Sequence, residues 1–169
     1  ELQKWIANSK NKAALEIIAR KVTTASRNRQ KAKEQKELNR KKNEISTAAL
    51  PIKLWDCDLA GTDEAELYIC EGESAVTSLK AARDGRINAL LGIRGKIINA
   101  HKSPMKSVLA NAEVQDIIKA LGAGAGNDFD IDKMRYGRIF IAVDADSDGN
   151  GIAALLYALF WHLFRDVLK

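Results

Sequence analysis

The stretch Ile139-Phe140-Ile141-Ala142-Val143-Asp144-Ala145-Asp146-Ser147-Asp148-Gly149 decides the fold, because it joins five apolar residues to three alternating aspartates. Residues 139–143 are apolar and rich in β-branched and aromatic side chains, which predicts a short buried strand. The aspartates come where this strand should end, and a helix is expected from about Gly151 onward. A strand, a loop and a helix in this order are typical of α/β proteins.

Strands and helices also alternate upstream of this stretch. Residues 67–70 predict a buried strand that stops at Glu71-Gly72, and Ser74 is a fair N-cap for a helix that reaches about residue 83. The remaining elements are a strand over 87–93, helices over 103–110 and 113–121, and a flexible loop at Gly122, Gly124 and Gly126. The alternation predicts the α/β class, with a parallel sheet that helices cover on both faces.

The first 45 residues contain neither Gly nor Pro and predict one long helix. An apolar stripe marks its first half, so the helix is expected to pack at its start and to run into solvent or along a partner at its end. The stripe consists of Leu15, Ile18, Val22 and Ala25. Between Lys10 and Lys42 stand twelve Lys or Arg residues and three Glu, whereas the whole chain carries a formal net charge of +5. Such a basic arm favours nucleic acid as partner, with a solvated charged helix as the alternative.

Pro51 ends this arm, and residues 51–63 are interpreted as a linker. The predicted division is therefore a basic helical arm with its linker over residues 1–62, and an α/β domain over residues 63–169. The chain begins at Glu1 rather than at a methionine, which predicts a piece of a longer protein.

The composition excludes several classes of protein. No signal peptide is visible, and the longest apolar run, residues 152–161, is too short to cross a bilayer, which takes about 20 residues. Cys57 and Cys70 have no His or Cys cluster beside them, so free thiols in an intracellular protein are expected rather than a zinc site, with a disulfide left open. His101 and His162 are unpaired in the sequence, and His162, which follows an apolar helix face, is interpreted as a structural residue.

Carboxylates follow the ends of two predicted strands. Glu71 ends one strand, while Asp144, Asp146 and Asp148 follow another. Ligand sites of parallel α/β sheets lie outside the carboxyl ends of strands, so these four acids converge if the two strands are neighbours. Crowded carboxylates repel one another, and a divalent cation removes that cost. Ligation by oxygen alone suits Mg²⁺, which in such sites commonly acts on phosphodiesters.

Three other interpretations compete with this one. An EF-hand begins with the same acidic spacing, but its twelfth position is Leu155 here instead of Glu, and a strand precedes the loop instead of a helix. Acids that merely cap the last helix explain one or two of the aspartates but not three. The spacing of Gly122, Gly124 and Gly126 matches neither the P-loop nor the dinucleotide-binding fingerprint.

Three stretches together resemble a known family. Residues Glu71-Gly72-Glu73-Ser74-Ala75, Arg94-Gly95-Lys96-Ile97-Ile98-Asn99 and Asp144-Ala145-Asp146-Ser147-Asp148-Gly149 are similar to the signature stretches of the Toprim domain of type IIA topoisomerases. This is the lineage of gyrase B, topoisomerase IV and eukaryotic topoisomerase II. Residues 49–57, 120–124 and 133–136 match its flanking stretches in type and order. The resemblance implies a Rossmann-like parallel sheet flanked by helices, and a chain that stops inside the Toprim fold, truncated at its C-terminus.

The resemblance also implies roles for single residues. Glu71 would be the general acid/base and a metal ligand, Asp144 and Asp146 would bind Mg²⁺, and Asp148 would support a second metal position. Arg94 and Lys96 would lie close to the DNA or to the charge of the transition state. The nucleophilic tyrosine would come from a partner subunit or region, since Tyr68, Tyr136 and Tyr157 stand in apolar contexts where packing is expected.

The function that the resemblance implies is Mg²⁺-dependent cleavage and rejoining of double-stranded DNA within an ATP-dependent type IIA topoisomerase. The implied assembly is a dimer or an A₂B₂ heterotetramer with the tyrosine-bearing breakage-reunion subunit, cytoplasmic and nucleoid-associated, with ATP bound elsewhere in the full-length protein. Glu73 and Asn150 depart from the usual family residues and point to a divergent member, of phage or other atypical origin. The alternatives are another Toprim enzyme, such as a primase or an OLD-type nuclease, and a non-catalytic module that binds nucleic acid.

Overall fold

The computed structural model describes residues 9–46 and 48–169 of the chain, which divides by its contacts into the units Glu1–Arg40 and Lys41–Lys169. Helix α2 (Lys12–Ser46) follows a short 3-10 turn, η1 (Ser9–Asn11), and confirms the predicted long helix; its expected first residues, 1–8, lie outside the described residues. The predicted packing at its start is wrong, because Ile17, Ile18 and Val22 are at least half exposed. A stripe of about one apolar residue per turn is too narrow to hold a helix against a core.

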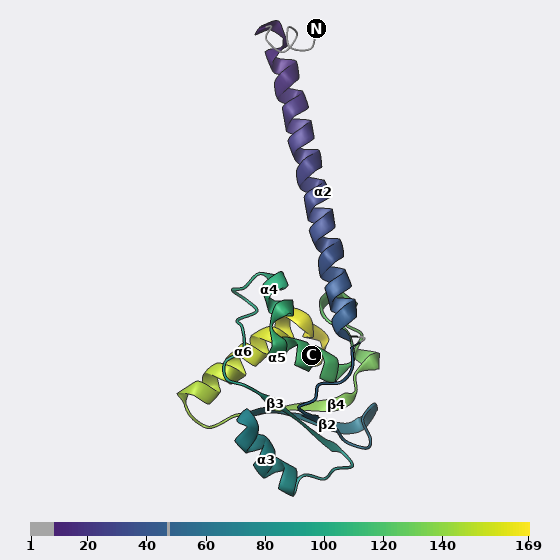
Figure 1. Cartoon of the computed structure of the whole chain (residues 1–169), viewed down its shortest axis with the longest axis vertical. Helices are drawn as coiled ribbons and strands as arrows, with labels where there is room; N and C mark the ends of the chain where they lie inside the picture. Colours follow the sequence, from purple (N-terminus) through teal and green to yellow (C-terminus); the bar gives the residue numbers. More distant parts are fainter. Residues whose placement is uncertain (1–8, 47) are drawn as a thin grey trace. The chain divides into compact units, whose positions relative to one another are not determined.

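A four-stranded sheet forms the centre of the second unit, in the order β1-β3-β2-β4 (Figure 1). The predicted parallel strands are β2 (Thr62–Glu71), β3 (Asn88–Ile93) and β4 (Tyr136–Ala142). Strand β1 (Leu54–Trp55) pairs antiparallel with β3 and lies in the stretch interpreted as a linker. A turn in which the Leu54 N–H donates to the Pro51 carbonyl, at 3.0 Å, starts this strand. The sheet is therefore mixed, with one short antiparallel edge.

Helices cover the sheet as two layers. Helix α3 (Gly72–Ala82) lies on one face, and α4 (Met105–Ala110), α5 (Ala112–Leu121) and α6 (Ser147–Leu163) lie on the other (Figure 1). Helix α5 packs on the sheet through its apolar stripe, whose side chains are fully buried: Val114, Ile117, Ile118 and Leu121. Short 3-10 turns complete the unit: η2 (Gly126–Asp128), η3 (Ile131–Lys133) and η4 (Arg165–Leu168).

Two expectations about packing need correction. The loop at Gly122–Gly126 was expected to be flexible, yet Ala123 and Ala125 are buried, and the Asp130 N–H donates to the Ala123 carbonyl at 2.9 Å. The apolar strand β4 was expected to be covered on both faces, but it lies at the sheet edge and leaves Phe140 39% exposed, stacked on Tyr68. An edge position gives a strand only one neighbour, so its outer side chains are left partly open.

The two cysteines are free, as predicted, and both are buried. Burial raises the pKa of the Cys70 thiol to about 11, so this thiol is protonated at neutral pH and poorly reactive. Among residues 9–46 and 48–169, no helix combines the length and the apolar character that crossing a membrane requires.

Asp56 fastens the stretch before β2 to the start of β4. Its carboxylate accepts a hydrogen bond from the Tyr136 hydroxyl at 2.8 Å and pairs with the Arg135 guanidinium. Tyr136 is 1% exposed, and burial together with this hydrogen bond raises the pKa of its hydroxyl. A buried hydroxyl that donates to a carboxylate contributes more to stability than an average hydrogen bond does.

Replacing Tyr136 by Phe should lower the free energy of unfolding by about 1–2 kcal/mol, because Asp56 loses a buried donor. The matched control is Tyr157→Phe, at a position 57% exposed, which should change that free energy by less than about 0.5 kcal/mol. Urea unfolding followed by circular dichroism measures both variants. Equal losses in the two would show that the Asp56 contact contributes nothing.

Candidate metal centre

The chain changes direction at β2. We call the place beside the carboxyl end of β2 the crevice, because α/β sheets bind ligands in the crevice at such a point. From β2 it passes through α3 to β3 on one side, then returns through α4 and α5 to β4 on the other side of β2. The carboxyl ends of β2 and β4 therefore flank a topological switch point, where ligands of α/β sheets bind. Cys70 pairs with Ala142 in the register of these strands, so Glu71 comes level with Val143, and Asp144 follows one residue later. The structure thus confirms that the two acidic strand ends are neighbours.

Glu71 is the last residue of β2 and the N-cap position of α3. The chain turns abruptly at Gly72, whose φ of 81° lies in the left-handed region that favours glycine. The Glu71 side chain is half-buried, and its Oε2 atom is buried without a hydrogen-bond partner. A buried carboxylate oxygen without a donor is costly, and a bound cation is one way to satisfy it.

Asp146 caps helix α6, whose first residue, Ser147, lies four residues before the predicted start at Gly151. Its Oδ1 accepts a hydrogen bond from the Gly149 N–H at 2.7 Å, an N-cap that uses only one of the two carboxylate oxygens. Gly149 is buried, and a Cβ there would stand 2.1 Å from the Asp144 carbonyl oxygen. The acidic loop is therefore wound tightly against the first turn of α6, and glycine at 149 permits it.

Basic residues of the loop after β3 are paired with acids around the crevice. The Lys96 ammonium binds the Asp148 carboxylate at 2.8 Å, which raises the pKa of Lys96 and lowers that of Asp148. Asp146 and Glu71 add weaker electrostatic attraction to the same ammonium. Arg94 pairs with Glu73 at 2.6 Å, and this bond raises the pKa of the guanidinium. The Lys96 ammonium thus lies close to residues that are predicted to bind the metal ion.

The predicted convergence of all four carboxylates is not seen. Within residues 9–46 and 48–169, no three His, Cys, Asp or Glu side chains lie close enough together to hold a metal ion. Asp146 is held by its own helix and Asp148 by Lys96, while Asp144 is exposed. The donors are all oxygens and one of them is a buried atom without a partner, so their chemistry fits a hard divalent cation such as Mg²⁺.

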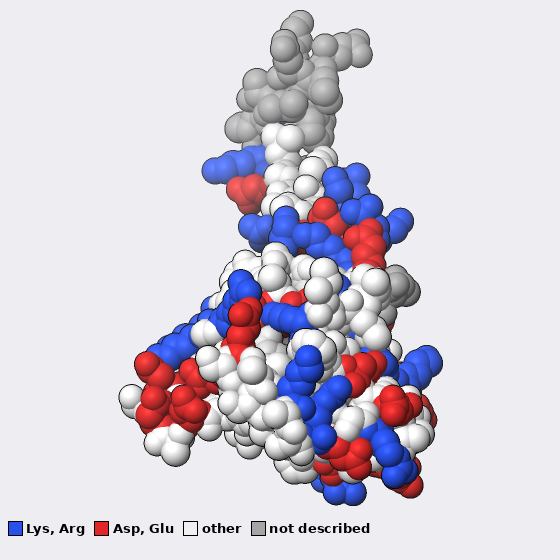
Figure 2. All heavy atoms as spheres, turned by 60° about the horizontal axis from the view of Figure 1, so that its bottom comes forward, with Lys and Arg blue, Asp and Glu red and all other residues white. Residues whose placement is uncertain are grey.

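The distribution of charge agrees with a site at this edge. Figure 2 shows acidic side chains gathered at the left edge of the second unit, with basic ones beside them, and Figure 1 has the turn from β4 into α6 at that edge. A hollow of about 930 Å³ is lined by Gly72, Glu73 and Arg94 together with residues 48–53, but its lining includes neither Glu71 nor the three aspartates.

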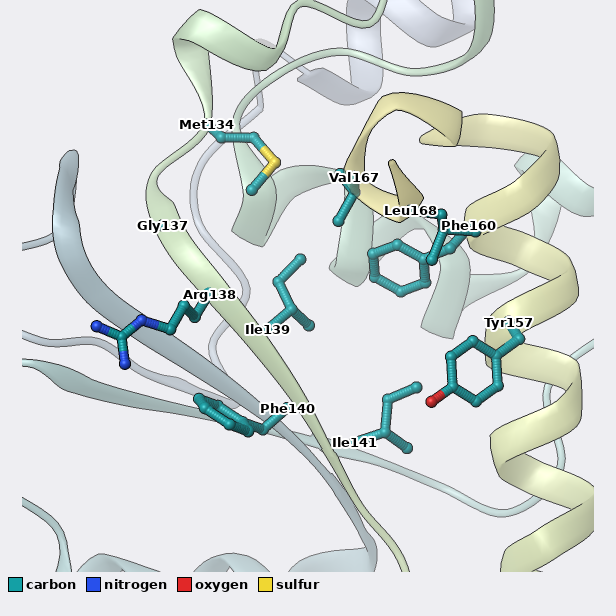
Figure 3. Close-up of a pocket in the computed structure, with 10 residues that line it drawn as sticks. All are labelled: Met134, Gly137, Arg138, Ile139, Phe140, Ile141, Tyr157, Phe160, Val167 and Leu168. Atoms are coloured by element: carbon teal, nitrogen blue, oxygen red, sulfur yellow. The ribbon is translucent and has the colours of Figure 1, made fainter.

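A second cavity, of about 330 Å³, lies between β4, α6 and η4, and no carboxylate lines it (Figure 3). Its apolar lining makes it unsuitable for a metal ion. Tyr157 stands at this cavity and is 57% exposed, which corrects the expectation that it is a packing residue.

Sequence reasoning missed one pair of side chains. His101 Nδ1 lies 3.3 Å from His162 Nε2, although 61 residues separate them in the chain. The sequence predicts two unpaired histidines, of which His162 is interpreted as structural. Local spacing holds no signal for such a pair, because a loop and a distant helix end bring it together.

Comparison with known proteins agrees with this geometry. The model of the Toprim domain matches residues 66–168. The chain belongs to the Toprim domain family. The match begins inside β2 and includes Glu71, the whole of β3 and β4, the loop with Arg94 and Lys96, and the three aspartates.

Relatives of this Toprim domain are type IIA topoisomerase proteins. The DNA gyrase B protein of Thermotoga maritima is 43% identical over 159 residues, which cover 94% of this chain and 25% of that protein. The DNA gyrase B protein of Campylobacter jejuni is 39% identical over 158 residues, 94% of this chain and 20% of that protein. The chain spans about a quarter of the length of such relatives. A crystal structure of the Plasmodium falciparum topoisomerase II DNA-binding, cleavage and re-ligation domain superposes with a TM-score of 0.61 and 30% identity, over 67% of this chain and 17% of that one.

The close approach at Gly149 can be tested against a neighbouring glycine of the same helix. Gly149→Ala should lower the free energy of unfolding by about 1–3 kcal/mol, because its Cβ collides with the Asp144 carbonyl and forces the backbone apart. Gly151→Ala places its Cβ 3.5 Å from Lys96 Cε, an ordinary contact, and should stabilise α6 by up to about 1 kcal/mol. Thermal and urea unfolding measure both. Two variants of equal stability would contradict the tight winding of the acidic loop.

Proposed function

We propose that this Toprim domain is the Mg²⁺-dependent cleavage and rejoining domain of an ATP-dependent type IIA DNA topoisomerase. The observation that carries the proposal is the partnerless, buried Oε2 of Glu71 at the switch point, beside the strand that leads into Asp144 and Asp146. Gyrase B and topoisomerase II relatives support it. Double-stranded DNA is the proposed substrate, in a cytoplasmic, nucleoid-associated enzyme.

We assign the ligands and the acid/base as the sequence predicts them. Glu71, Asp144 and Asp146 hold Mg²⁺, with Asp148 at a second metal position. A bound Mg²⁺ would neutralise charge that develops on the phosphodiester. Glu71 also exchanges the proton of the attacking or leaving oxygen, a role that its half-buried place at the crevice permits.

Arg94 and Lys96 form the proposed contact with the scissile phosphate. Both side chains are exposed, and both extend from one loop beside the crevice. Their carboxylate partners, Glu73 and Asp148, hold them near the crevice and must release them to bind DNA. Such exchanges are cheap for exposed ion pairs, which contribute little to stability.

The nucleophilic tyrosine is proposed to come from a breakage-reunion partner, in a dimer or an A₂B₂ assembly whose ATP-binding domain lies elsewhere. Tyr136 is unsuited to attack, because it is buried and bound to Asp56. Tyr68 donates its hydroxyl to Glu66 and stacks on Phe140. Tyr157 borders an apolar cavity without a carboxylate (Figure 3).

The basic helix α2 supplies a second, sequence-independent contact in this proposal. Its Lys and Arg side chains are mostly exposed, so they can displace counterions from DNA phosphates. This arm favours a topoisomerase over a primase or an OLD-type nuclease, as does the Arg94-Gly95-Lys96 stretch. A non-catalytic module would need no partnerless carboxylate oxygen at the switch point.

Substitutions of Asp146 distinguish its proposed role in metal binding from its role as a helix cap, because asparagine caps a helix as well as aspartate does. In the assembled enzyme, Asp146→Asn should keep the stability of the domain and lower Mg²⁺-dependent DNA cleavage at least about 100-fold, whereas Asp146→Ala should also cost about 1 kcal/mol of stability. Plasmid cleavage and thermal unfolding provide the two readouts. Normal cleavage by Asp146→Asn, with unchanged dependence on Mg²⁺, would refute the assignment.

A further inference from the structure

We propose that His101 and His162 form a second metal site, for a divalent transition-metal ion with a preference for Zn²⁺. These are the only two histidines of the 169-residue chain, and the fold brings their ring nitrogens to 3.3 Å. Both rings are exposed, so an ion can reach them from solvent. Imidazole nitrogen suits Zn²⁺, Ni²⁺ and Cu²⁺, whereas the oxygen ligands of the acidic crevice suit Mg²⁺. The inference is independent of the proposed function.

The distance between the two nitrogens matches tetrahedral ligation. Zn–N bonds measure about 2.0–2.1 Å, so two ligands at a tetrahedral angle stand about 3.3–3.4 Å apart. His101 Nδ1 and His162 Nε2 are 3.3 Å apart, and their ring centroids 5.5 Å. In the hydrogen-bonded pair one of the two facing nitrogens carries the proton. On metal binding this proton moves, through solvent, to the other nitrogen of the same ring, and the neutral pair releases no net proton.

Both histidines stand on backbone that is already fixed. The Asn99 side chain accepts from the His101 and Lys102 N–H groups, at 3.0 and 3.2 Å, and this closes a tight turn around His101. Ala100, next to His101, is buried, which anchors the turn. His162 lies in the last turn of α6, followed by the buried Leu163. Because the backbone at both histidines is already ordered, binding of a metal ion costs little conformational entropy. Preorganisation of this kind raises affinity.

The surroundings leave room for the remaining ligands. His162 lines a hollow of about 360 Å³ together with Trp161, Arg165 and Asp166. The Arg165 guanidinium lies over the Trp161 ring, 4.4 Å from its centroid, and so makes a cation–π contact with that ring. No third His, Cys, Asp or Glu completes a site among the described residues, so water supplies the other positions of this two-residue site.

The site has a structural consequence for the loop that carries Arg94 and Lys96. Lys96 ties this loop to Asp148, in the first turn of α6, and His101 ties it to the last turn of the same helix. The two ties are roughly 20 Å apart along the helix at 1.5 Å per residue. Zn²⁺ would replace a hydrogen bond at the far tie with two metal bonds and thereby hold the loop along α6.

The test is a calorimetric titration of the whole chain with Zn²⁺ in excess Mg²⁺. The Mg²⁺ is added to occupy sites whose ligands are all oxygens. The unmodified chain should bind one Zn²⁺. Loss of even an outer partner lowers metal affinity about 10–100-fold, so His101→Gln and His162→Gln should each weaken binding at least about tenfold. Lys102→Gln, an exposed neighbour of His101, is the matched control and should bind as tightly as the parent chain.

Nuclear magnetic resonance gives an independent readout, because only two imidazole spin systems exist in the chain. Both should shift with the same Zn²⁺ dependence, and hydrogen exchange of residues 97–102 should slow. Zn²⁺ affinity unchanged in both Gln variants, a shift of one ring alone, or binding that excess Mg²⁺ abolishes would each overturn the proposal.

Discussion

Negative charge concentrated where two parallel strands end is the constraint on which the candidate site depends. Strand β2 ends at Glu71, and its neighbour β4 leads into three aspartates, so the sheet itself places four carboxylates at one edge. Carboxylates repel one another the more strongly the closer they approach, and the buried Glu71 oxygen without a donor adds a desolvation cost. The fold offsets part of that charge with the Lys96 ammonium and with the N-terminal turn of α6.

Two glycines make this arrangement possible. Gly72 takes a left-handed conformation directly after Glu71, so α3 can begin at once and the carboxylate stays at the strand end. Gly149 lets the first turn of α6 approach the Asp144 carbonyl. A side chain at position 149 would collide with the Asp144 carbonyl, and one at position 72 would be strained by the positive φ. The geometry of the acids is therefore set by backbone that only small residues allow.

The sequence predicted the features that local chemistry determines. Strands β2, β3 and β4 carry apolar runs, α5 carries a clear stripe with Asn111 and Gly122 at its ends, and the acids follow strand ends. The sequence left open whether β2 and β4 are neighbours, and the structure shows that they are. Features that depend on contacts between distant parts of the chain could not be predicted from the sequence. Strand β1 exists because β3 offers a free edge, α6 starts early because Asp146 caps it, and His101 meets His162 only through the fold.

The central claim is that Glu71 and the aspartates after β4 share one hard cation. Anomalous scattering from crystals of the chain soaked in Mn²⁺, a substitute for Mg²⁺ with a measurable signal, tests it most directly. The account predicts one peak about 2.0–2.2 Å from oxygens of both Glu71 and Asp144 or Asp146. A peak elsewhere, with the Glu71 carboxylate turned toward a different partner, would contradict it.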